Sequence, residues 1–239
     1  MIEKINKLKE LINKSNNIVF FTGAGVSTES GIPDFRSKDG LYNKKNEYDL
    51  PPEYLLSNRC FYDNTKVFFD NYKKTMNLIK YEPNITHKYI KKLEDEGKVK
   101  AVITQNIDDL HNKAGSKVVY ELHGNINRNY CNKCNKFYDA NSVFNCDGIP
   151  TCKCGGIIKP DVVLYGEQLP EDAYFGSIKA VKEADLLIVI GTSLTVYPAS
   201  GLVDMFDGDL VIINKDATLY DNRAKLVIHK PLKDVFSKL

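Results

Sequence analysis

Residues 20–37 read FFTGAGVSTESGIPDFRS and join an apolar run to a glycine-rich loop. Gly23 and Gly25 begin as a dinucleotide-binding fingerprint does, in which backbone N–H groups at the start of a helix close on a pyrophosphate. Thr28 stands where that fingerprint has a third small residue, and the acidic residue expected about 20 positions later at the end of a second strand is missing. The segment therefore predicts a nucleotide-binding α/β fold but disfavours an ordinary NAD-dependent dehydrogenase.

Short apolar runs rich in Val and Ile recur along the chain and alternate with helical patterns. Several of these runs are apolar on both faces, as strands of a buried parallel sheet are. The alternation predicts an α/β fold with a Rossmann-like doubly wound parallel sheet. The predicted strands are residues 18–22, 99–104, 118–122, 186–190, 210–214 and 226–228, and the helical patterns include residues 87–96 and 174–184.

Two segments interrupt the alternation, because residues 39–83 are aromatic and helical in pattern and residues 129–158 hold five of the six cysteines. We interpret both as insertions that form a second, smaller domain, made of a helical module (39–83) and a zinc-binding module (129–158). The Rossmann-type domain is then discontinuous and comprises residues 1–38, 84–128 and 159–239.

Four of the cysteines form two close pairs, Cys131 with Cys134 and Cys152 with Cys154. The spacing fits a structural zinc site, in which two turns each present two thiolates to one tetrahedral ion, although disulfides are an alternative. The second pair has one intervening residue instead of two, so nearby Cys146 is a further candidate ligand. Because four thiolates leave no open position on the metal, the zinc is predicted to stabilise the small domain and to take no part in chemistry.

Composition and charge exclude some classes of protein. Hydrophobic residues make up 43% of the chain and the formal net charge is +2, which gives no overall attraction to nucleic acid or to an anionic membrane. The apolar side chains of residues 2–12 share one helical face among charged residues, unlike a signal peptide, and no segment approaches the length of a membrane span. We therefore expect a cytoplasmic protein that binds neither nucleic acid nor membrane.

Polar or glycine-rich segments follow five of the predicted strands. In a doubly wound sheet, ligands bind beyond the carboxyl ends of the strands, so these segments are expected to meet at one site. In chain order they read TGAGVSTESGIPDFRS, TQNIDDLHNKAG, ELHGN, GTSLTVYPAS and NK.

These segments, with the cysteine pairs and VVLYGE at residues 162–167, resemble the sirtuins, a family of NAD-consuming protein deacylases. The resemblance runs in order from about residue 18 to residue 228. It implies a Rossmann-type domain with a smaller domain that holds one structural zinc ion. It also implies a transferase reaction in which NAD, as a consumed co-substrate, and an acetylated lysine of a protein or peptide yield nicotinamide, free lysine and acetyl-ADP-ribose.

The resemblance further implies catalytic roles. His123 is expected to be the general base, since a neutral imidazole can take the proton of a ribose hydroxyl that then attacks the imidate formed by the acyl oxygen. Asn106 and Asp108 match a pair next to the nicotinamide carboxamide, although NIDD is also a plausible helix start with acidic caps. His111 is expected to be structural.

A wider set of residues matches the NAD site of the family. Phe35 is expected to cover the departing nicotinamide and to shield the sugar from water, with Arg36 beside a phosphate or ribose. An enzyme that breaks the bond between nicotinamide and ribose needs more from this loop than helix packing, which accounts for Thr28. The predicted NAD-binding residues are Ala24, Thr28, Phe35, Arg36, Gln105, Ile107, Asp108, His123, Thr192, Ser193 and Asn214.

For the acyl-peptide, the family adds an extended substrate backbone as a strand between two loops, which correspond here to residues 163–167 and 194–197. The predicted substrate-binding residues are Val163, Tyr165, Gly166, Glu167 and Val196. Val163 is expected to line the acyl-lysine tunnel, and Tyr165 stands where the family often has phenylalanine. Relatives that prefer dicarboxylic acyl groups carry a Tyr-x-x-Arg pair in the small domain, and residues 39–83 contain none. We therefore expect acetyl to be preferred over succinyl.

Two other functions are compatible with these motifs. A protein ADP-ribosyltransferase would let a protein nucleophile capture the same sugar centre. A non-catalytic NAD-binding zinc module would only bind, but the presence of His123, Asn106 and Asp108 argues against it.

Overall fold

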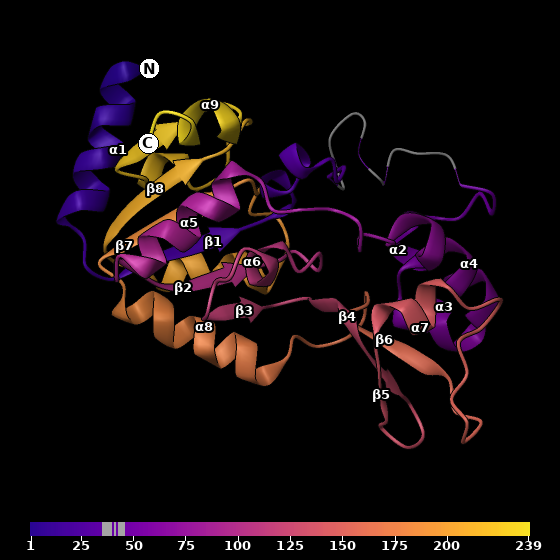
Figure 1. Cartoon of the computed structure of the whole chain (residues 1–239). Coiled ribbons are helices and arrows are strands. Elements are labelled where there is room, and N and C mark those ends of the chain that lie inside the picture. The colour runs from indigo at the N-terminus through magenta and orange to yellow at the C-terminus, as the bar shows by residue number, and fades with distance from the viewer. Residues whose placement is uncertain (35–39, 41, 43–45) are drawn as a thin grey trace.

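The computed structural model describes residues 1–34, 40, 42 and 46–239, and two sheets organise it (Figure 1). The strands are β1 (Ile18–Thr22), β2 (Val99–Thr104), β3 (Val119–Glu121), β4 (Gly124–Cys131), β5 (Phe137–Tyr138), β6 (Ile158–Val162), β7 (Leu186–Ile190), β8 (Asp209–Ile213) and β9 (Leu226–Ile228). The helices are α1 (Ile2–Lys14), α2 (Pro52–Leu55), α3 (Asn58–Asp63), α4 (Thr65–Thr75), α5 (Ile85–Asp95), α6 (Leu110–Lys113), α7 (Ala140–Phe144), α8 (Glu171–Glu183) and α9 (Leu232–Phe236), with short 3-10 segments η1 (Ala24–Val26), η2 (Thr28–Ser30), η4 (Ala199–Met205) and η5 (Asp221–Arg223).

The larger sheet has six strands in the order β3-β2-β1-β7-β8-β9, and every neighbouring pair is parallel. The strand order reverses between β1 and β7, which is where a doubly wound sheet opens a crevice for ligands. The predicted Rossmann-like parallel sheet is confirmed, and the strand ends differ from the predicted ones by one residue at most.

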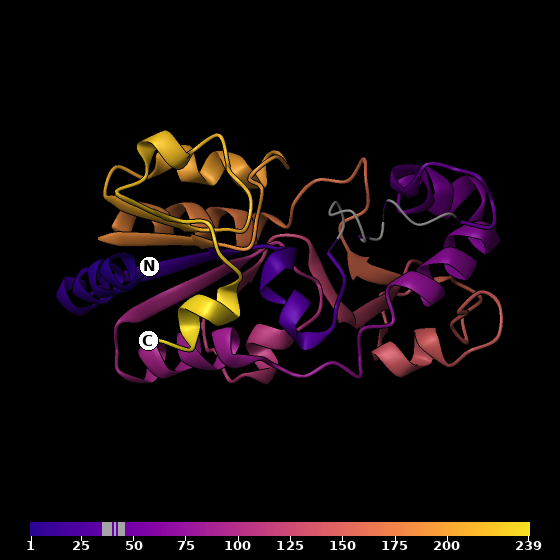
Figure 2. The same cartoon turned by 90° about the horizontal axis from the view of Figure 1, so that it is seen from above.

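Helices cover both faces of this sheet (Figures 1 and 2). Successive side chains of a strand point to opposite faces. Phe20 accordingly packs in a layer with α1, α5 and α9, whereas Phe21 packs in a second layer with α8 and η4. Both rings are fully buried, so β1 is the centre of the core, and its last residue delivers the chain directly into the glycine-rich loop.

The smaller sheet is antiparallel, in the order β5-β4-β6, and lies with α2, α3, α4 and α7 at the other end of the molecule (Figure 1). Phe61, Phe68, Phe69 and Tyr72 form its aromatic core with edge-to-face and stacked contacts. This sheet is absent from the predicted elements, because β4 begins at Gly124, inside the polar segment ELHGN that ends a predicted strand. Strands β4 and β6 therefore connect the cysteine pairs to the edge of the large sheet.

The helices of the described residues are all too short or too polar to cross a membrane.

Candidate active site

A cavity of about 750 Å³ opens at the carboxyl ends of the large sheet and continues toward β6 and α4. The segments after β1, β2, β3, β7 and β8 all contribute to its wall, so the expected convergence of these polar segments is observed. The predicted site residues that line it are Ala24, Thr28, Gln105, Asn106, Ile107, His123, Val163, Tyr165, Gly166, Glu167, Thr192, Ser193, Val196 and Asn214. Phe35 and Arg36 lie outside the described residues.

The glycines of the first loop are required by a close approach of two backbones. A Cβ on Gly25 would lie 2.7 Å from the Cα of Gly191, and a Cβ on Gly23 would lie 2.6 Å from the Cβ of Thr192. The N–H of Gly25 donates to the carbonyl of Gly191 at 2.8 Å, and the N–H of Gly23 donates to Ile190 at 3.2 Å. These two N–H groups thus join β1 to β7 and are not free for a pyrophosphate, which corrects the role expected from the fingerprint.

Thr28 lies on the cavity side of this loop, and its Oγ1 donates to the carbonyl of Gly25 at 3.0 Å. It is solvent-exposed and packs no helix against the sheet. The position thus differs in structure, as well as in residue type, from the third small residue of a dehydrogenase fingerprint.

A buried hydrogen-bond network lies beneath the same loop. Ser27 Oγ donates to Asp108 Oδ2 at 2.6 Å and accepts from Asn106 Nδ2 at 3.1 Å. Asp108 Oδ1 also accepts the N–H of Leu110 at the start of α6, at 3.0 Å. Burial raises the pKa of Asp108, and the Ser27 and Leu110 hydrogen bonds partly offset this rise. Asn106 lines the cavity but Asp108 lies behind it, so Asp108 acts on the cavity wall through Ser27 and Asn106.

His123 lies at the turn between β3 and β4, mostly buried and facing the cavity. Its Nδ1 is 2.9 Å from the carbonyl oxygen of Gln105, which can only accept, so Nδ1 carries the proton and Nε2 has a free lone pair. Burial lowers the pKa of His123, while the hydrogen bond to Gln105 acts in the opposite direction. The imidazole is therefore neutral at pH 7 with Nε2 available as a base.

Gln105 and Thr192 connect the two halves of the crevice. Gln105 Nε2 donates to Thr192 Oγ1 at 3.0 Å, and the same Oγ1 accepts the N–H of Leu194 at 3.2 Å. Beyond Thr192, Ser193 and Asn214 line the end of the cavity formed after β7 and β8. The crevice thus offers hydroxyl and amide groups at one end and the imidazole of His123 further along.

The segment after β6 forms the wall beside His123. The N–H of Val163 donates to the carbonyl of His123 at 2.9 Å. Tyr165 pairs through its backbone with Leu56 and Asn58 of the small end. Glu167 accepts from Lys159, at 3.1 Å, and from Asn58 and the N–H of Leu164, so its side chain holds the loop in shape. The Tyr165 hydroxyl is also engaged, since its Oη lies 2.6 Å from Tyr42 Oη.

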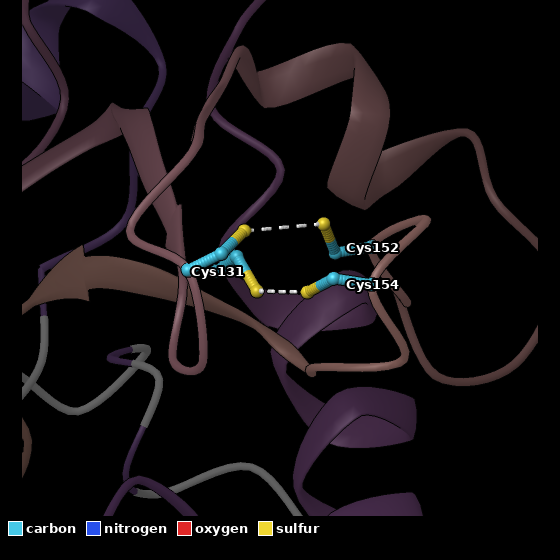
Figure 3. Close-up of side chains that lie close together, drawn as sticks. Cys131, Cys152 and Cys154 are labelled. Carbon is cyan, nitrogen blue, oxygen red and sulfur yellow. Dashed lines mark hydrogen bonds between the residues drawn. The ribbon is translucent and has the colours of Figure 1, made fainter.

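Four cysteines lie together on two loops of the small end, with sulfurs facing one another (Figure 3). Cys131 and Cys154 Sγ are 3.4 Å apart and Cys134 and Cys152 Sγ are 3.7 Å apart, and all four Sγ atoms lie within 4.8 Å of one another. A tetrahedral zinc ion with Zn–S bonds of about 2.3 Å separates its sulfurs by about 3.8 Å, so the cluster fits zinc.

The surroundings of the cluster support thiolate ligands. Tyr138 Oη donates to Cys152 Sγ at 3.0 Å, and the N–H of Lys133 donates to Cys131 Sγ at 3.4 Å. Cys146 is not part of the cluster, because its Sγ donates to the carbonyl of Val143 and accepts from Lys73. The four cysteines of the two close pairs thus form a cluster that fits a structural zinc ion, and none of the six cysteines forms a disulfide.

Two parts of the site are not predictable from the local sequence. Ser27 was not singled out, because its burial and its hydrogen bond to Asp108, 81 positions away in the chain, arise from tertiary packing. Tyr72 and Met76 of the small end also line the cavity, and no local pattern in the sequence indicates this. Their contribution depends on how α4 packs against β6, which is a tertiary property.

Comparison with known proteins identifies the family of this chain. A model of the Sir2 family matches residues 23–198. A protein of Clostridium acetobutylicum named NAD-dependent protein deacetylase is 54% identical, over 95% of this chain and 94% of its own. A solved structure of Sir2 with a deacetylated p53 peptide and 3'-O-acetyl ADP ribose is 37% identical, with a TM-score of 0.91 over 98% of this chain and 96% of that chain. A structure of Sir2 with a p53 peptide and NAD+ is also 37% identical over the same shares, with a TM-score of 0.86. With a family model covering most of its length, the chain belongs to the Sir2 family, the sirtuins.

Proposed function

We propose that this protein is an NAD-dependent protein lysine deacetylase, a transferase that moves the acetyl group of an acetyl-lysine to ADP-ribose and releases nicotinamide. The observation that carries the proposal is His123, with Nδ1 fixed by Gln105 and Nε2 free beside the cavity. Its relative from Clostridium acetobutylicum carries the name of this activity, and the Sir2 structure with acetyl ADP ribose holds the product that the reaction predicts.

When bound, NAD supplies a ribose carbon that an acyl oxygen can capture as nicotinamide leaves. His123 Nε2 accepts the proton of a ribose hydroxyl, which makes that oxygen nucleophilic. Its lowered pKa keeps it in the neutral form that this step requires. Gln105 holds the ring so that the lone pair stays on the cavity side.

Asn106 and Ile107 form the proposed nicotinamide end of the cavity. The amide nitrogen of Asn106 is engaged with Ser27, so its Oδ1 is the group available to accept from a carboxamide. Asp108 accepts the hydrogen bond of Ser27 and so orients it, and it is not proposed to contact the ligand directly. Phe35 and Arg36 retain their proposed roles as cover of the nicotinamide and partner of a phosphate or ribose.

At the other end, Thr192, Ser193 and Asn214 are proposed to hold the adenosine ribose, with Ala24 and Thr28 along the path between. The hydroxyl of Thr192 is oriented by Gln105, the same residue whose backbone orients His123. One residue therefore sets the position of both the base and the nucleotide wall.

The acyl-peptide is proposed to bind as an added strand between residues 163–167 and 194–197. Val163, Tyr165, Gly166 and Val196 line the cavity along this path. Glu167 contributes by holding the first loop through Lys159 and Asn58. The zinc ion, held by Cys131, Cys134, Cys152 and Cys154, fixes the sheet from which this loop emerges and takes no part in the chemistry.

The division into two domains is part of the proposal. Residues 1–38, 84–128 and 159–239 form the proposed Rossmann-type domain, and residues 39–83 and 129–158 form the smaller one. The protein is proposed to act in the cytoplasm, where a site of four thiolates stays reduced. Cell fractionation with the tagged protein tests the compartment, and recovery in an exported fraction would contradict it.

The decisive experiment is mass spectrometry of an acetyl-lysine peptide incubated with the protein, with and without NAD. NAD-dependent loss of acetyl with matching formation of acetyl-ADP-ribose, abolished in His123→Ala, is the expected result. Consumption of NAD with ADP-ribose attached to protein and the acetyl group retained would replace the proposal with an ADP-ribosyltransferase. Binding of NAD without any product would leave only a binding module.

A further inference from the structure

A hydrogen-bond network at the junction of the two sheets holds the chain on both sides of His123. It centres on the carboxylate of Asp109, at the start of α6. Asp109 Oδ1 accepts from Asn112 Nδ2 and from Asn125 Nδ2, at 2.7 Å each, and its Oδ2 accepts from Asn127 Nδ2 at 2.8 Å. Asn125 and Asn127 belong to β4, which begins one residue after His123. One carboxylate thus ties α6 to the strand that follows the proposed base.

Glu121 extends the network to the strand that precedes His123. It is the last residue of β3, and its Oε1 accepts from the same two amide nitrogens, Asn112 Nδ2 at 2.8 Å and Asn125 Nδ2 at 2.6 Å. A side-chain amide nitrogen carries two hydrogens, so each of these residues can donate one to Asp109 and one to Glu121. Both flanks of His123 are therefore fixed by one set of side chains.

A second anchor holds Glu121 from the small sheet. Its Oε2 accepts from Arg128 Nη1 at 2.5 Å, and Arg128 Nε donates to Asp161 Oδ2 at 2.7 Å. Arg128 belongs to β4 and Asp161 to the neighbouring β6. The network thus spans α6, the end of the large sheet and two strands of the small sheet.

The donors restrict what can stand at position 109. Three amide nitrogens point at the two carboxylate oxygens of Asp109, and an amide nitrogen donates but does not accept. Asn125 is only 2% exposed, so a donor that lost its acceptor there would stay buried at a cost in free energy. The arrangement therefore requires acceptors at both oxygens of residue 109.

The backbone of Asp109 supports a role for its side chain. Its φ is 66° and its ψ is 7°, in the left-handed region that glycine adopts most easily. Asp109 makes no side-chain cap to α6, because the N–H of Leu110 donates to Asp108 instead. Helix capping does not account for an aspartate here, whereas the contacts with β4 do.

Asp109 does not line the cavity, so it reaches the reaction only through residues that do. His123 lies in the short turn between the two flanks that the network holds. The proposed nicotinamide end has an anchor of its own, because Asn106 donates to Ser27. Loss of the Asp109 carboxylate is therefore expected to disturb the turn of His123 more than the nicotinamide end.

We propose that Asp109 is a positioning residue for the base: its carboxylate, through Asn125, Asn127 and Glu121, holds the turn that places His123 Nε2 at the ribose hydroxyl. This inference rests on the proposed deacetylase function and adds a residue to that same site. Asp109 touches no reacting atom, and the role of His123 is unchanged.

Two rates separate the step that His123 assists from the step before it. In the proposed mechanism the bond between nicotinamide and ribose breaks before His123 acts. In the reverse of that step, the ring nitrogen of labelled nicotinamide bonds to the ribose carbon and the acyl oxygen leaves it. Uptake of labelled nicotinamide into NAD, with acetyl-lysine peptide present, therefore measures the earlier step, and release of free lysine measures the later one.

Asp109→Asn is the main variant, because an amide keeps the size of the side chain but offers one acceptor oxygen instead of two. At saturating NAD and peptide, kcat for deacetylation is expected to fall roughly 10-fold, while nicotinamide exchange and the Kd of NAD stay within about 2-fold of wild type. Asp49→Asn is the matched control, since Asp49 also has a left-handed backbone, with φ 52°, and lies outside the cavity wall.

A compensating exchange tests the contact itself. In the double variant Asp109→Asn with Asn127→Asp, the amide nitrogen at position 109 can donate to a carboxylate at position 127, and its oxygen can still accept from Asn125. Deacetylation is expected to recover most of its wild-type rate, whereas Asn127→Asp alone sets two carboxylates against each other and should lower it. Failure of the double variant to improve on Asp109→Asn would overturn the inference.

A second substitution separates positioning from folding. Asp109→Gly removes the carboxylate but suits the left-handed backbone, so it is expected to fold and to show the same selective loss of deacetylation. An equal loss of both rates in Asp109→Asn and Asp109→Gly, no loss in either, or failure of both to fold would show that Asp109 does not position His123.

The outcomes also distinguish this inference from the function on which it rests. If the wild-type protein deacetylates the peptide and the two rates do not separate in the variants, the role of Asp109 alone is overturned. If the wild-type protein shows no NAD-dependent deacetylation, the proposed function is overturned and the inference with it.

Discussion

His123 shows how a single hydrogen bond can determine the role of a residue. The carbonyl of Gln105 fixes the proton on Nδ1, and burial lowers the pKa, so the ring presents a neutral Nε2 to the cavity. His123→Ala is expected to reduce kcat/KM for deacetylation by roughly 10² to 10⁴, the usual contribution of a general base. Steady-state assays with an acetyl-lysine peptide measure this, and a melting curve close to wild type excludes unfolding as the cause.

The pH profile gives an independent check on the same residue. A base works only when unprotonated, so its contribution is lost as pH falls through its pKa. Because the pKa of His123 lies below the ordinary value of about 6.5, kcat/KM should stay level from neutral pH down to about 6.5 and fall only at lower pH. A decline that begins well above this value would contradict the assignment of His123 as the base.

Ser27 is the central residue of the buried hydrogen-bond network beside Asn106. Ser27→Ala removes the acceptor of Asn106 Nδ2 and the donor to Asp108, leaving two buried polar groups without that partner. We expect transition-state stabilisation to fall by about 1 to 2 kcal/mol, which corresponds to a roughly tenfold reduction of kcat/KM for NAD. Ser30→Ala, three residues further along the chain and outside the cavity wall, is the matched control. Equal losses in both variants would show that the effect is a general one of the loop.

At the scale of elements, the junction of β1 and β7 depends on glycine. Gly25→Ala would place a Cβ 2.7 Å from the Cα of Gly191, and the backbones of both residues are held by hydrogen bonds. We expect a loss of about 1 to 3 kcal/mol in unfolding free energy and weaker binding of NAD, because the two loops must separate. Gly201→Ala in η4, whose nearest contact would be an ordinary 3.5 Å, is the control and should not lower stability. Calorimetry of both variants with and without NAD measures the difference.

A buried histidine at the start of helix α5 makes the stability of the fold depend on pH. His87 accepts the N–H of Asn84 at the start of the helix, and burial lowers its pKa to about 4. Because the unfolded chain binds a proton near pH 6.5 and the folded chain does not, stability is lost as pH falls from 6.5 toward 4. Between pH 7 and pH 5 this loss amounts to roughly 2 kcal/mol.

Urea titrations at both pH values test this for the wild type and His87→Gln, which cannot titrate at that position. The exposed His229→Gln is the control and should keep the wild-type loss on the acid side. All three proteins retain the cysteine cluster, so the difference in acid-side loss reports His87 together with its effect on His111, whose ring lies 4.8 Å away and whose pKa is lowered by burial and by His87. The same slope in His87→Gln as in the wild type would contradict the prediction.

An element could be predicted from the sequence when a local pattern determines it, and could not when tertiary packing determines it. Strands such as β1 and β7 are uninterrupted apolar runs, so their ends could be predicted to the residue. The cysteine ligands were predictable because zinc chelation imposes a spacing on the sequence itself. The small sheet was missed because β4 is polar in much of its length, β5 is only two residues long, and the longer pairing of β4 is with β6, more than 25 positions away in the chain. Tyr72 was missed for a similar reason, since its place in the cavity depends on the packing of α4.

In the whole molecule, one continuous path links the zinc cluster to the active site. Strand β4 runs from Gly124, next to His123, to the ligand Cys131, and β6 returns from the cluster to Val162. The proposed substrate loop begins at Val163, whose N–H donates to the carbonyl of His123. A change at the cluster is therefore expected to reach both the base and the substrate wall, although the large sheet has a separate core.

The last prediction concerns removal of the metal. Cys134→Ala should lose the zinc ion and destabilise the small end, because structural zinc can contribute on the order of 10 kcal/mol to folding. Peptide binding should weaken more than NAD binding, since the proposed substrate loop emerges from the affected sheet and the nucleotide end is built on the large sheet.

Cys146→Ala is the matched control: this thiol lies outside the cluster, so zinc content should stay at one ion per chain. Metal analysis, melting curves and separate titrations of peptide and NAD measure these effects. A Cys134→Ala protein with full zinc content and an unchanged melting curve would refute the structural site, and loss of zinc from Cys146→Ala would reassign one of its ligands.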